Sequence, residues 1–250
     1  MHKYTWKPSQ PDHRDRPFKL RLTEECLPKS VDLRPQCPPV YNQGSVGSCT
    51  ANASAAAFEF DLKRQGKTDF QPSRLFIYYN ERVLDRSGVQ NDNGSYLRTA
   101  AKVLNQFGVC DENSWPYTRD FTVMPTPECY AEATKHISTT YNAIPDGDLH
   151  GLKSCLASGY PFIFGFMVYE SFETQEVGRT GRMPMPAPNE PNLGGHAVMG
   201  VGYDDDAQCV IVRNSWGTQW GDEGYFHMPY AYISNPSLAS DFWQITTVTG

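Results

Sequence analysis

Apolar residues recur at helical spacing through the first half of the chain. Residues 49–65 are rich in alanine, phenylalanine and leucine and are followed by a glycine, which predicts a long helix that ends there. Similar periodicity predicts helices over 73–84 and 95–107. Ser73 and Ser95 are placed to cap the amino ends of these two helices. We therefore expect the first half to be helical.

The second half follows a different pattern. One short helix is expected over 148–158, capped by its first residue, an aspartate. Runs of β-branched and aromatic residues predict strands over 161–168, 197–203, 210–213, 224–228 and 242–248. The proline-rich segment 178–193 is expected to be an extended loop. Helices followed by strands predict an α+β protein of two lobes, a helical one over 27–145 and a β-rich one over 146–250, with a site between them.

Residues 1–26 contain prolines and charged residues without apolar periodicity, which predicts an extended leader or short pro-segment. This segment lacks the apolar central region of a signal peptide. We therefore expect a secreted or extracytoplasmic protein if a signal was trimmed, and an intracellular one otherwise. The sequence does not choose between these destinations.

Composition narrows the range of partners. Hydrophobic residues make up 39% of the chain and charged residues 20%, so one large domain or two smaller lobes can bury a core. The net charge of −6 argues against nucleic acid as a partner, because phosphate binding needs a basic surface. No apolar stretch approaches the length of a membrane span. We expect a monomer that acts without nucleic acid or membrane.

A cysteine that follows two glycines opens the first predicted helix, in the segment 42–51, NQGSVGSCTA. Unpaired N–H groups and the positive dipole end of a helix favour a thiolate over a thiol at such a position. Gln43 is placed to donate an amide N–H to a developing oxyanion. Cys49 is therefore a candidate nucleophile. Taken alone, the segment also fits a buried and inert cysteine.

Two later segments complete a larger pattern. Residues 194–203 read GGHAVMGVGY, and residues 213–225 read RNSWGTQWGDEGY. Together with 42–51 they resemble the papain-like cysteine peptidases of the papain and cathepsin family. The resemblance implies a two-lobe fold, with a helical N-terminal lobe, a β-barrel-like C-terminal lobe and the active site in the cleft between them.

The positions that carry the chemistry of the family are filled. The resemblance makes Cys49 the nucleophile, His196 the general acid/base, Asn214 the residue that orients the imidazole, and Gln43 the oxyanion-hole side chain. The separation of Cys49 and His196 lies within the roughly 130–150 residues typical of the family. The implied activity is that of an endopeptidase, which hydrolyses peptide bonds through a thioester without a cofactor. Alone, His196 would fit a core histidine and Asn214 a turn.

The substrate-binding positions match less closely. The segment 92–96, DNGSY, aligns with a family motif that begins with cysteine and carries two glycines, whose backbone pairs with the substrate as an added strand. Gly94 fits this motif, but Ser95 replaces the second glycine. The family cysteine in this motif is normally bonded to one at position 46. Here Asp92 and Val46 occupy the two positions, so that disulfide is expected to be absent.

Three more residues are implied in substrate binding. Gly195 would keep small the wall of the pocket before the scissile residue, which favours a bulky or apolar side chain there. The resemblance makes Trp216 a shield of the histidine and asparagine against water, and Trp220 a wall on the leaving-group side. Both tryptophans would otherwise fit core aromatics.

The leader suggests regulation as a zymogen. Relatives are commonly made with an inhibitory propeptide, which is far longer than residues 1–26 and carries a helical motif not found here. A short extended leader would inhibit by lying in the cleft and running against the direction of the substrate. The alternative is a disordered terminus.

Two rival functions stay open at this point. One is an acyl transferase or peptide ligase that uses the same catalytic residues, and the other is a catalytically silent binding protein on the same fold. No two cysteines have the close spacing of a zinc site, so no metal is expected. The cysteines other than Cys49 allow fifteen full pairings or free buried thiols. They are Cys26, Cys37, Cys110, Cys129, Cys155 and Cys209.

Overall fold

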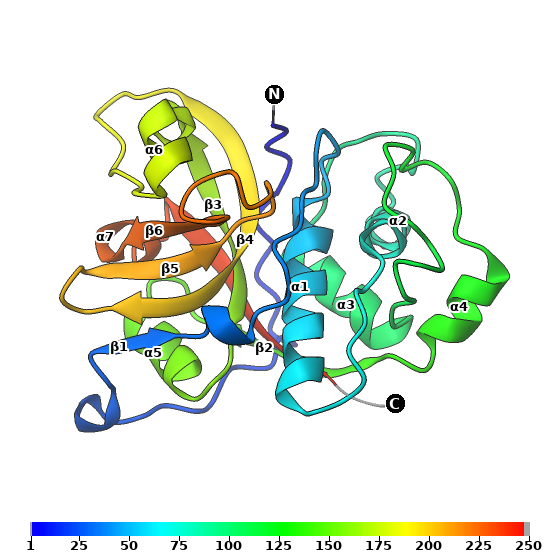
Figure 1. Ribbon diagram of the computed structural model, residues 1–250, viewed down its shortest axis with the longest axis horizontal. Coiled ribbons are helices and arrows are strands. Elements are labelled where there is room, and N and C mark those ends of the chain that lie inside the picture. The colour runs from blue at the N-terminus through cyan, green and yellow to red at the C-terminus, as the bar shows by residue number, and fades with distance from the viewer. Residues whose placement is uncertain (1, 248–250) are drawn as a thin grey trace.

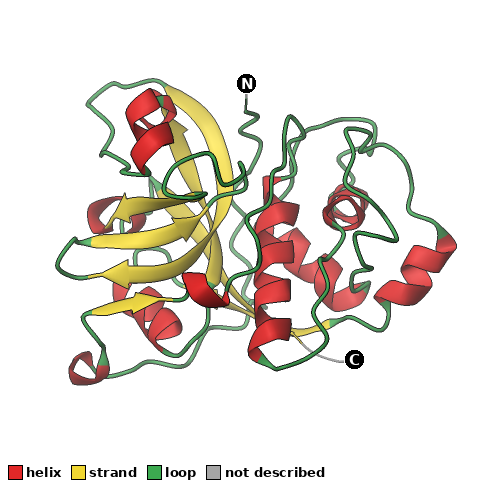
Figure 2. Ribbon diagram, in the orientation of Figure 1, coloured by secondary structure: helices red, strands yellow, loops and turns green. Residues whose placement is uncertain are grey.

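The helices of the first part of the chain, up to residue 133, gather on one side of the molecule, and an antiparallel sheet with the remaining helices around it forms the other side (Figures 1 and 2). The computed structural model describes residues 2–247. The helices are α1 (Cys49–Arg64), α2 (Arg74–Leu84), α3 (Leu97–Gln106), α4 (Pro127–Ala133), α5 (Leu149–Ala157), α6 (Gln175–Thr180) and α7 (Tyr230–Ile233). The strands are β1 (Ser30–Asp32), β2 (Ser138–Ile144), β3 (Phe162–Tyr169), β4 (Asn192–Asp204), β5 (Cys209–Arg213), β6 (Tyr225–Pro229) and β7 (Ala239–Thr247).

Helix α1 lies at the boundary between the helices and the sheet. It packs against α2, α3, β4 and β7, and every residue from Cys49 to Leu62 is buried. An alanine-rich sequence suits this position, because small side chains let neighbours on every side approach closely. The helix expected over 49–65 is confirmed, with Gln65 as its C-cap.

The cap predictions had different outcomes. Ser73 caps α2 by accepting the N–H of Phe76 at 3.2 Å, as expected. Asp148 caps α5 in the same way. The cap expected at Ser95 is wrong, because α3 begins at Leu97. The Ser95 hydroxyl instead donates to the carboxylate of Asp85 at 2.6 Å. Asp85 is the C-cap of α2, so the Ser95 side chain bonds to the end of α2 and does not cap α3.

The strands form one sheet in the order β2-β7-β3-β4-β5-β6, with β1 beside β4. All pairings among these strands are antiparallel. The five predicted strands correspond to β3–β7, and Val248, the predicted end of the last, lies outside the described residues. Strands β1 and β2 and helices α4, α6 and α7 were not predicted. The loop expected over 178–193 is wrong at both ends, because residues 178–180 are the last turn of α6 and β4 already begins at Asn192.

The first part of the leader runs in extended conformation between the helices and the sheet, and its last residues, Glu24–Cys26, form a 3-10 turn on the sheet side (Figure 1). Thr5 forms a parallel bridge with Gly195, and Pro17 forms one with Ala143. The structure describes the leader from residue 2, and Met1 lies outside the described residues. None of the described helices is long and apolar enough to cross a membrane.

Candidate active site

Cys49 is the first residue of α1, and it has no exposed surface. Ser48 is the N-cap, but its side chain does not cap the helix. Its hydroxyl lies 2.6 Å from that of Tyr117 and accepts from the Asn52 amide at 3.0 Å. The N–H groups of the first helical turn have no partner within the helix. The thiol therefore lies beside free donors and the positive end of the helix dipole.

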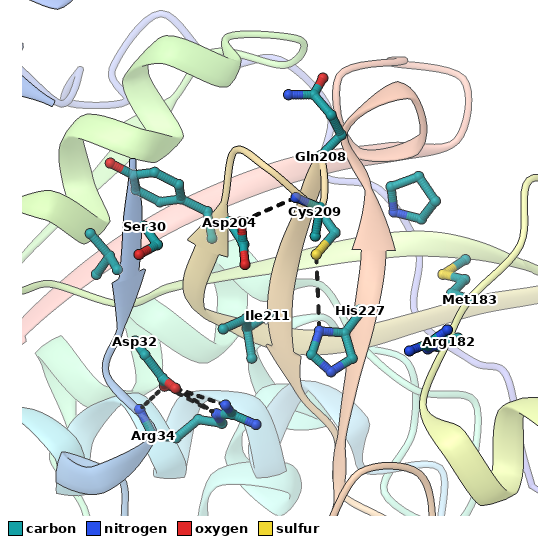
Figure 3. A pocket seen from close by; sticks show the side chains of 14 residues that line it. Ser30, Asp32, Arg34, Arg182, Met183, Asp204, Gln208, Cys209, Ile211 and His227 are labelled. Atoms are coloured by element: carbon teal, nitrogen blue, oxygen red, sulfur yellow. Dashed lines mark hydrogen bonds and ion pairs between the residues drawn. The ribbon is translucent and has the colours of Figure 1, made fainter. Parts of the chain in front are cut away.

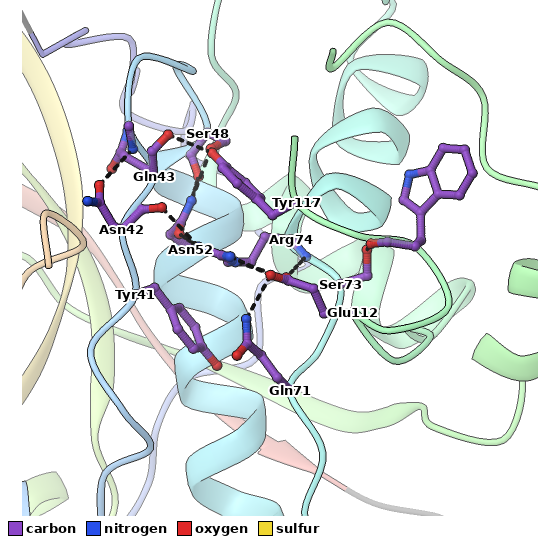
Figure 4. A network of polar contacts seen from close by, with 12 residues as sticks. Tyr41, Asn42, Gln43, Ser48, Asn52, Gln71, Ser73, Arg74, Glu112 and Tyr117 are labelled. Atoms are coloured by element: carbon purple, nitrogen blue, oxygen red, sulfur yellow. Dashed lines mark hydrogen bonds and ion pairs between the residues drawn. The ribbon is translucent and has the colours of Figure 1, made fainter. Parts of the chain in front are cut away.

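A buried arginine holds the loop in front of α1 (Figure 4). Nε of Arg74 donates to Oε2 of Glu112 at 2.9 Å, and Nη1 donates to the carbonyl oxygen of Asn42 at 3.3 Å. The guanidinium carbon also lies 4.0 Å from the centre of the Tyr117 ring. The hydroxyl of Tyr117 in turn donates to the carbonyl oxygen of Gln43 at 2.9 Å. Hydrogen bonds from α2 and from the segment before α4 thus fix this loop.

The side chain of Gln43 is oriented at both ends of its amide. Nε2 donates to the carbonyl oxygen of Val46 at 3.0 Å, and Oε1 accepts the hydroxyl of Ser215 at 2.6 Å. The backbone N–H of Gln43 also donates to the carbonyl oxygen of Ser215 at 2.9 Å. Because the amide nitrogen has two hydrogens and one acceptor among the described residues, one N–H is left to donate.

His196 comes from the sheet, where it pairs with Phe166 of β3. Its Nε2 lies 2.8 Å from Oδ1 of Asn214, and the same oxygen accepts the backbone N–H of Ser215 at 2.8 Å. Since this amide oxygen is an acceptor, Nε2 must carry the hydrogen. In the neutral ring, Nδ1 is then the basic nitrogen.

Aromatic rings surround the imidazole and hold its plane. Trp216 stacks on His196 with ring centres 5.0 Å apart and planes 24° apart. Phe166 meets the imidazole edge-on at 5.8 Å. Trp220 packs edge-on against Trp216 at 4.9 Å, and Phe172 contacts both tryptophans. Stacked and edge-on rings leave the imidazole little room to rotate.

Burial favours the neutral forms of the two candidate reacting groups. It raises the pKa of the Cys49 thiol to about 12, and it lowers the pKa of His196 to about 4. Nδ1 of His196 is buried and has no hydrogen-bond partner among the described residues. Both shifts disfavour an ion pair between the thiol and the imidazole in this state.

The leader covers the site. His2 stacks on Trp216 with ring centres 3.8 Å apart. Thr5 pairs with Gly195, the neighbour of the imidazole, and the N–H of Trp6 donates to the carbonyl oxygen of Gly195 at 3.0 Å. Trp6 is only 3% exposed. The described part of the leader thus packs directly on residues of the candidate site.

Three glycines make room for the leader. A Cβ at Gly165 would lie 1.9 Å from the ring of Trp6, and one at Gly195 would lie 2.5 Å from the Trp6 carbonyl oxygen. A Cβ at Gly94 would lie 2.1 Å from the carbonyl oxygen of Thr5. Contacts this short do not occur with real side chains, so glycine is required at these positions.

Hydrogen bonds link the segments that carry the predicted catalytic residues: Ser215, next to Asn214, bonds Gln43, and the backbone of Ala197, next to His196, bonds the Cys49 thiol. Helix α1 and its preceding loop supply Cys49 and Gln43, and the sheet side supplies His196 and Asn214. Of the expected substrate-binding residues, Gly94, Ser95, Gly195 and Trp216 contact the leader, whereas Trp220 packs behind Trp216. Sequence reasoning missed Trp6. A tryptophan in an otherwise polar leader could have indicated that the leader is packed against the rest of the protein.

Another hollow, of about 630 Å³, lies on the sheet near β1, β5 and β6 (Figure 3). Cys209 faces His227 there, with Sγ 3.9 Å from Nδ1. None of the predicted site residues lines this hollow. Within residues 2–247, no three histidine, cysteine or acidic side chains gather as metal ligands. All seven cysteines are free thiols, so none of the possible pairings is formed.

Comparisons with known proteins agree with this arrangement. Residues 27–241 match the model of the papain family of cysteine proteases. The chain is 44% identical to a peptidase C1-like protein of Acanthamoeba polyphaga mimivirus, over 96% of this chain and 86% of that protein. It is 31% identical to cathepsin B-like CP2 of Giardia intestinalis, over 81% of this chain and 69% of that one.

A solved structure is also similar. Xylellain, a cysteine protease from Xylella fastidiosa, superposes with a TM-score of 0.89 and 42% identity, covering 98% of this chain and 96% of that chain. The chain belongs to the papain family of cysteine proteases. It is therefore a hydrolase of the thiol protease class, and its substrates are peptides.

Proposed function

We propose that the protein is an endopeptidase that cleaves peptide bonds through a thioester on Cys49. The observation that carries this proposal is the geometry of the imidazole. Asn214 holds Nε2 of His196 at 2.8 Å, which leaves Nδ1 free on the side of the ring opposite this bond. The Cys49 thiol accepts a hydrogen bond from the backbone N–H of Ala197, which follows His196 in β4, so the proposed nucleophile and base come from different elements.

Each residue has a definite role in the proposed reaction. His196 takes the thiol proton, and the Cys49 thiolate attacks the carbonyl carbon. The negative oxygen accepts the Cys49 backbone N–H and the remaining N–H of Gln43. The imidazolium then gives its proton to the leaving amine, and the neutral ring activates the water that hydrolyses the thioester. Asn214 holds the ring without adding charge.

The leader supports a further part of the proposal, which is that residues 1–26 inhibit the enzyme. The resemblance places Gly195 on the acyl side of the cleft and Trp220, against which Trp216 packs, on the leaving-group side. Trp6 contacts Gly195, and His2 stacks on Trp216. The acyl part of a substrate is its N-terminal part, so the leader lies in the reverse direction. A reversed peptide does not present its carbonyl to Cys49 and the oxyanion donors as a substrate does.

Burial under the leader also opposes the chemistry. The raised pKa of Cys49 and the lowered pKa of His196 both disfavour the thiolate–imidazolium pair. Displacing the leader rehydrates both groups, and their mutual attraction then favours the ion pair. Activation by leader displacement therefore combines access with a change of protonation.

The test is hydrolysis of fluorogenic peptide amides under reducing conditions. We expect the full chain to be weakly active, Trp6→Ala to raise kcat/KM because the leader loses its most buried anchor, and Cys49→Ala to abolish activity in both backgrounds. An amine that outcompetes water for the thioester would instead indicate a transferase or ligase. Failure of a thiol-directed epoxide to label Cys49 in the Trp6→Ala chain would indicate a silent binding protein.

A further inference from the structure

Asp92 is a carboxylate beside the active site that has no role in the proposed chemistry. Its side chain is only 8% exposed. Both oxygens accept the backbone N–H of Gly47 at 3.0 Å, and Oδ1 accepts the hydroxyl of Tyr78 at 2.6 Å. Gly47 precedes Cys49 by two residues. Donors from the loop before α1 and from α2 therefore fix this negative charge close to the nucleophile.

The Asp92 contact joins two segments that the family joins covalently. Asp92 and Val46 occupy the positions of the two family cysteines, and the N–H that Asp92 accepts comes from Gly47, the next residue. The hydrogen bonds preserve the connection between the segments. The exchange of a neutral disulfide for a carboxylate adds a charge that the family motif does not have.

The leader places a cation on this carboxylate. Nζ of Lys3 forms an ion pair with Oδ2 of Asp92, and 46% of the lysine side chain remains exposed. Among residues 2–247, Lys3 is the one cation in an ion pair with Asp92. When the leader leaves the cleft, the mostly buried carboxylate loses this cation.

The leader and Asp92 both lie against the backbone of Gly47. A Cβ at Gly47 would lie 2.8 Å from Oγ1 of Thr5 and 3.0 Å from Oδ1 of Asp92. Thr5 is also paired with Gly195, which adjoins the imidazole. A substrate that replaces the leader passes over the same surface. The residue whose carbonyl carbon lies at Cys49 then has its side chain within reach of Asp92, if that side chain is long.

We propose that Asp92 selects substrates with lysine or arginine at the residue whose carbonyl carbon is attacked, a specificity that rests on the proposed peptidase function. The ammonium or guanidinium group takes the place of Nζ of Lys3. An acidic side chain is repelled there, and a neutral one leaves the carboxylate without a cation. Because the bound lysine is half exposed, we expect a preference of about tenfold over a neutral side chain of equal size.

The test compares peptides that differ in one group. Full chains carrying Trp6→Ala, with and without Asp92→Asn, are assayed on matched fluorogenic peptides that end in arginine or in its uncharged isostere citrulline. Asparagine still accepts from Gly47 and Tyr78, so it removes the charge with the least change of structure. We expect the ratio of kcat/KM for arginine to citrulline to fall from about ten to about one, with activity on citrulline changed only a few-fold.

Controls separate specificity from folding and from the reaction itself. Asp206→Asn removes an exposed carboxylate in the turn after β4 and should leave the ratio unchanged. A ratio near one with Asp92 intact, or a high ratio that survives Asp92→Asn, overturns the proposal. A ratio near one with Asp92 intact is measured without any Asp92 variant. The proposal can therefore be overturned even if Asp92→Asn does not fold. Loss of all Cys49-dependent cleavage would overturn the peptidase function instead, and equilibrium binding of both peptides to the chain with Trp6→Ala and Cys49→Ala would still test Asp92.

Discussion

The two walls of the cleft hold their reactive groups in different ways. On the helix side, hydrogen bonds from Arg74 and Tyr117 fix the loop that precedes Cys49. On the sheet side, a single hydrogen bond to Asn214 orients His196, and packed aromatic rings hold its plane. The oxyanion donors need fixed directions, which hydrogen bonds supply. The base needs a fixed ring plane in a dry site, which packed aromatic rings supply.

Loss of the base should have the largest effect on the reaction. In the Trp6→Ala background, we expect His196→Ala to lower kcat by about 10³-fold, because proton transfer to and from the reacting atoms is lost. We expect Gln43→Ala to lower kcat by about 10²-fold, because the Cys49 backbone N–H remains as an oxyanion donor. Steady-state hydrolysis of one peptide amide measures both.

His227→Ala and Gln208→Ala are the matched controls for these variants, since both residues line the separate hollow near β1, β5 and β6. Both should leave kcat within about twofold. Equal losses for His196→Ala and Gln43→Ala would contradict the division of roles between the two walls.

The second expected effect is on stability, and it compares the free energy of unfolding lost when one residue is changed on each side of the site. Arg74→Met leaves the Glu112 carboxylate, which is 14% exposed, without its guanidinium partner. We expect the free energy of unfolding to fall by about 3 kcal/mol. Phe172→Leu removes a few carbons from the aromatic wall and should cost only about 1 kcal/mol. Urea unfolding followed by circular dichroism measures both.

Arg179→Met serves as control for the arginine change. Its ion pair with Glu176 is exposed on both sides, so unfolding should change by about 0.5 kcal/mol or less. If the Arg74 and Phe172 variants lose equal stability, the polar wall is no more sensitive than the aromatic one.

Local signals account for what the sequence predicted well. Helix α2 begins after Ser73 because a serine hydroxyl reaches the backbone two or three residues later, which needs no tertiary information. Ser95 looks identical by this criterion, yet Asp85 competes for its hydroxyl. Strand β2 was missed because its residues are mostly half-buried and its partner β7 lies about a hundred residues away.

The candidate site was predictable to a different degree in each part. Motif resemblance placed Cys49 and His196, whose roles depend on residue type. It did not place Trp6 or Lys3, because their positions depend on surfaces far along the chain. Trp6 needs the bare backbone of Gly165, and the glycine alone does not reveal what fills the space. Such contacts follow only from the assembled fold.

Acidification should weaken docking of the leader, because docking buries two imidazole rings and so disfavours their protonation. With the leader docked, burial lowers the pKa of His196 to about 4, and it also lowers that of His2. In the Cys49→Ala chain, where no thiolate can pair with His196, leader displacement lets both rings return toward 6.5. The displaced state then binds more protons, so docking is strongest above pH 6.5 and weakens as pH falls toward 4.

Hydrogen exchange can measure this effect on the leader itself. The N–H of Trp6 donates to Gly195, whereas that of Phe18 donates to Ala143 farther along the leader. After correction for intrinsic rates, protection of Trp6 should fall between pH 7.5 and pH 5, while protection of Phe18 changes less. If the Trp6 and Phe18 N–H groups lost protection equally, the change would come from loosening of the whole leader and not from protonation of the imidazole.

The smallest expected effect tests the polar connection between the walls. The Ser215 hydroxyl donates to Oε1 of Gln43 at 2.6 Å. This hydrogen bond connects the loop before α1, which carries Gln43, to the segment that carries Asn214. Ser215→Ala should lower the free energy of unfolding by about 1 kcal/mol. Because the backbone bond from Gln43 to Ser215 remains, the loop should stay in place and the freed amide should only lose its fixed direction.

The kinetic consequence of Ser215→Ala follows from that distinction. An amide free to rotate presents its N–H to the oxyanion for part of the time, so kcat should fall several-fold, less than for Gln43→Ala. KM should stay nearly constant, because the lost direction matters mainly once the oxyanion forms. Ser158→Ala, at the end of α5, is the matched control, since its hydroxyl only donates to Ser154. A rise in KM with kcat unchanged would instead place Ser215 in substrate binding, and the two walls would then be coupled through the substrate and not through Gln43.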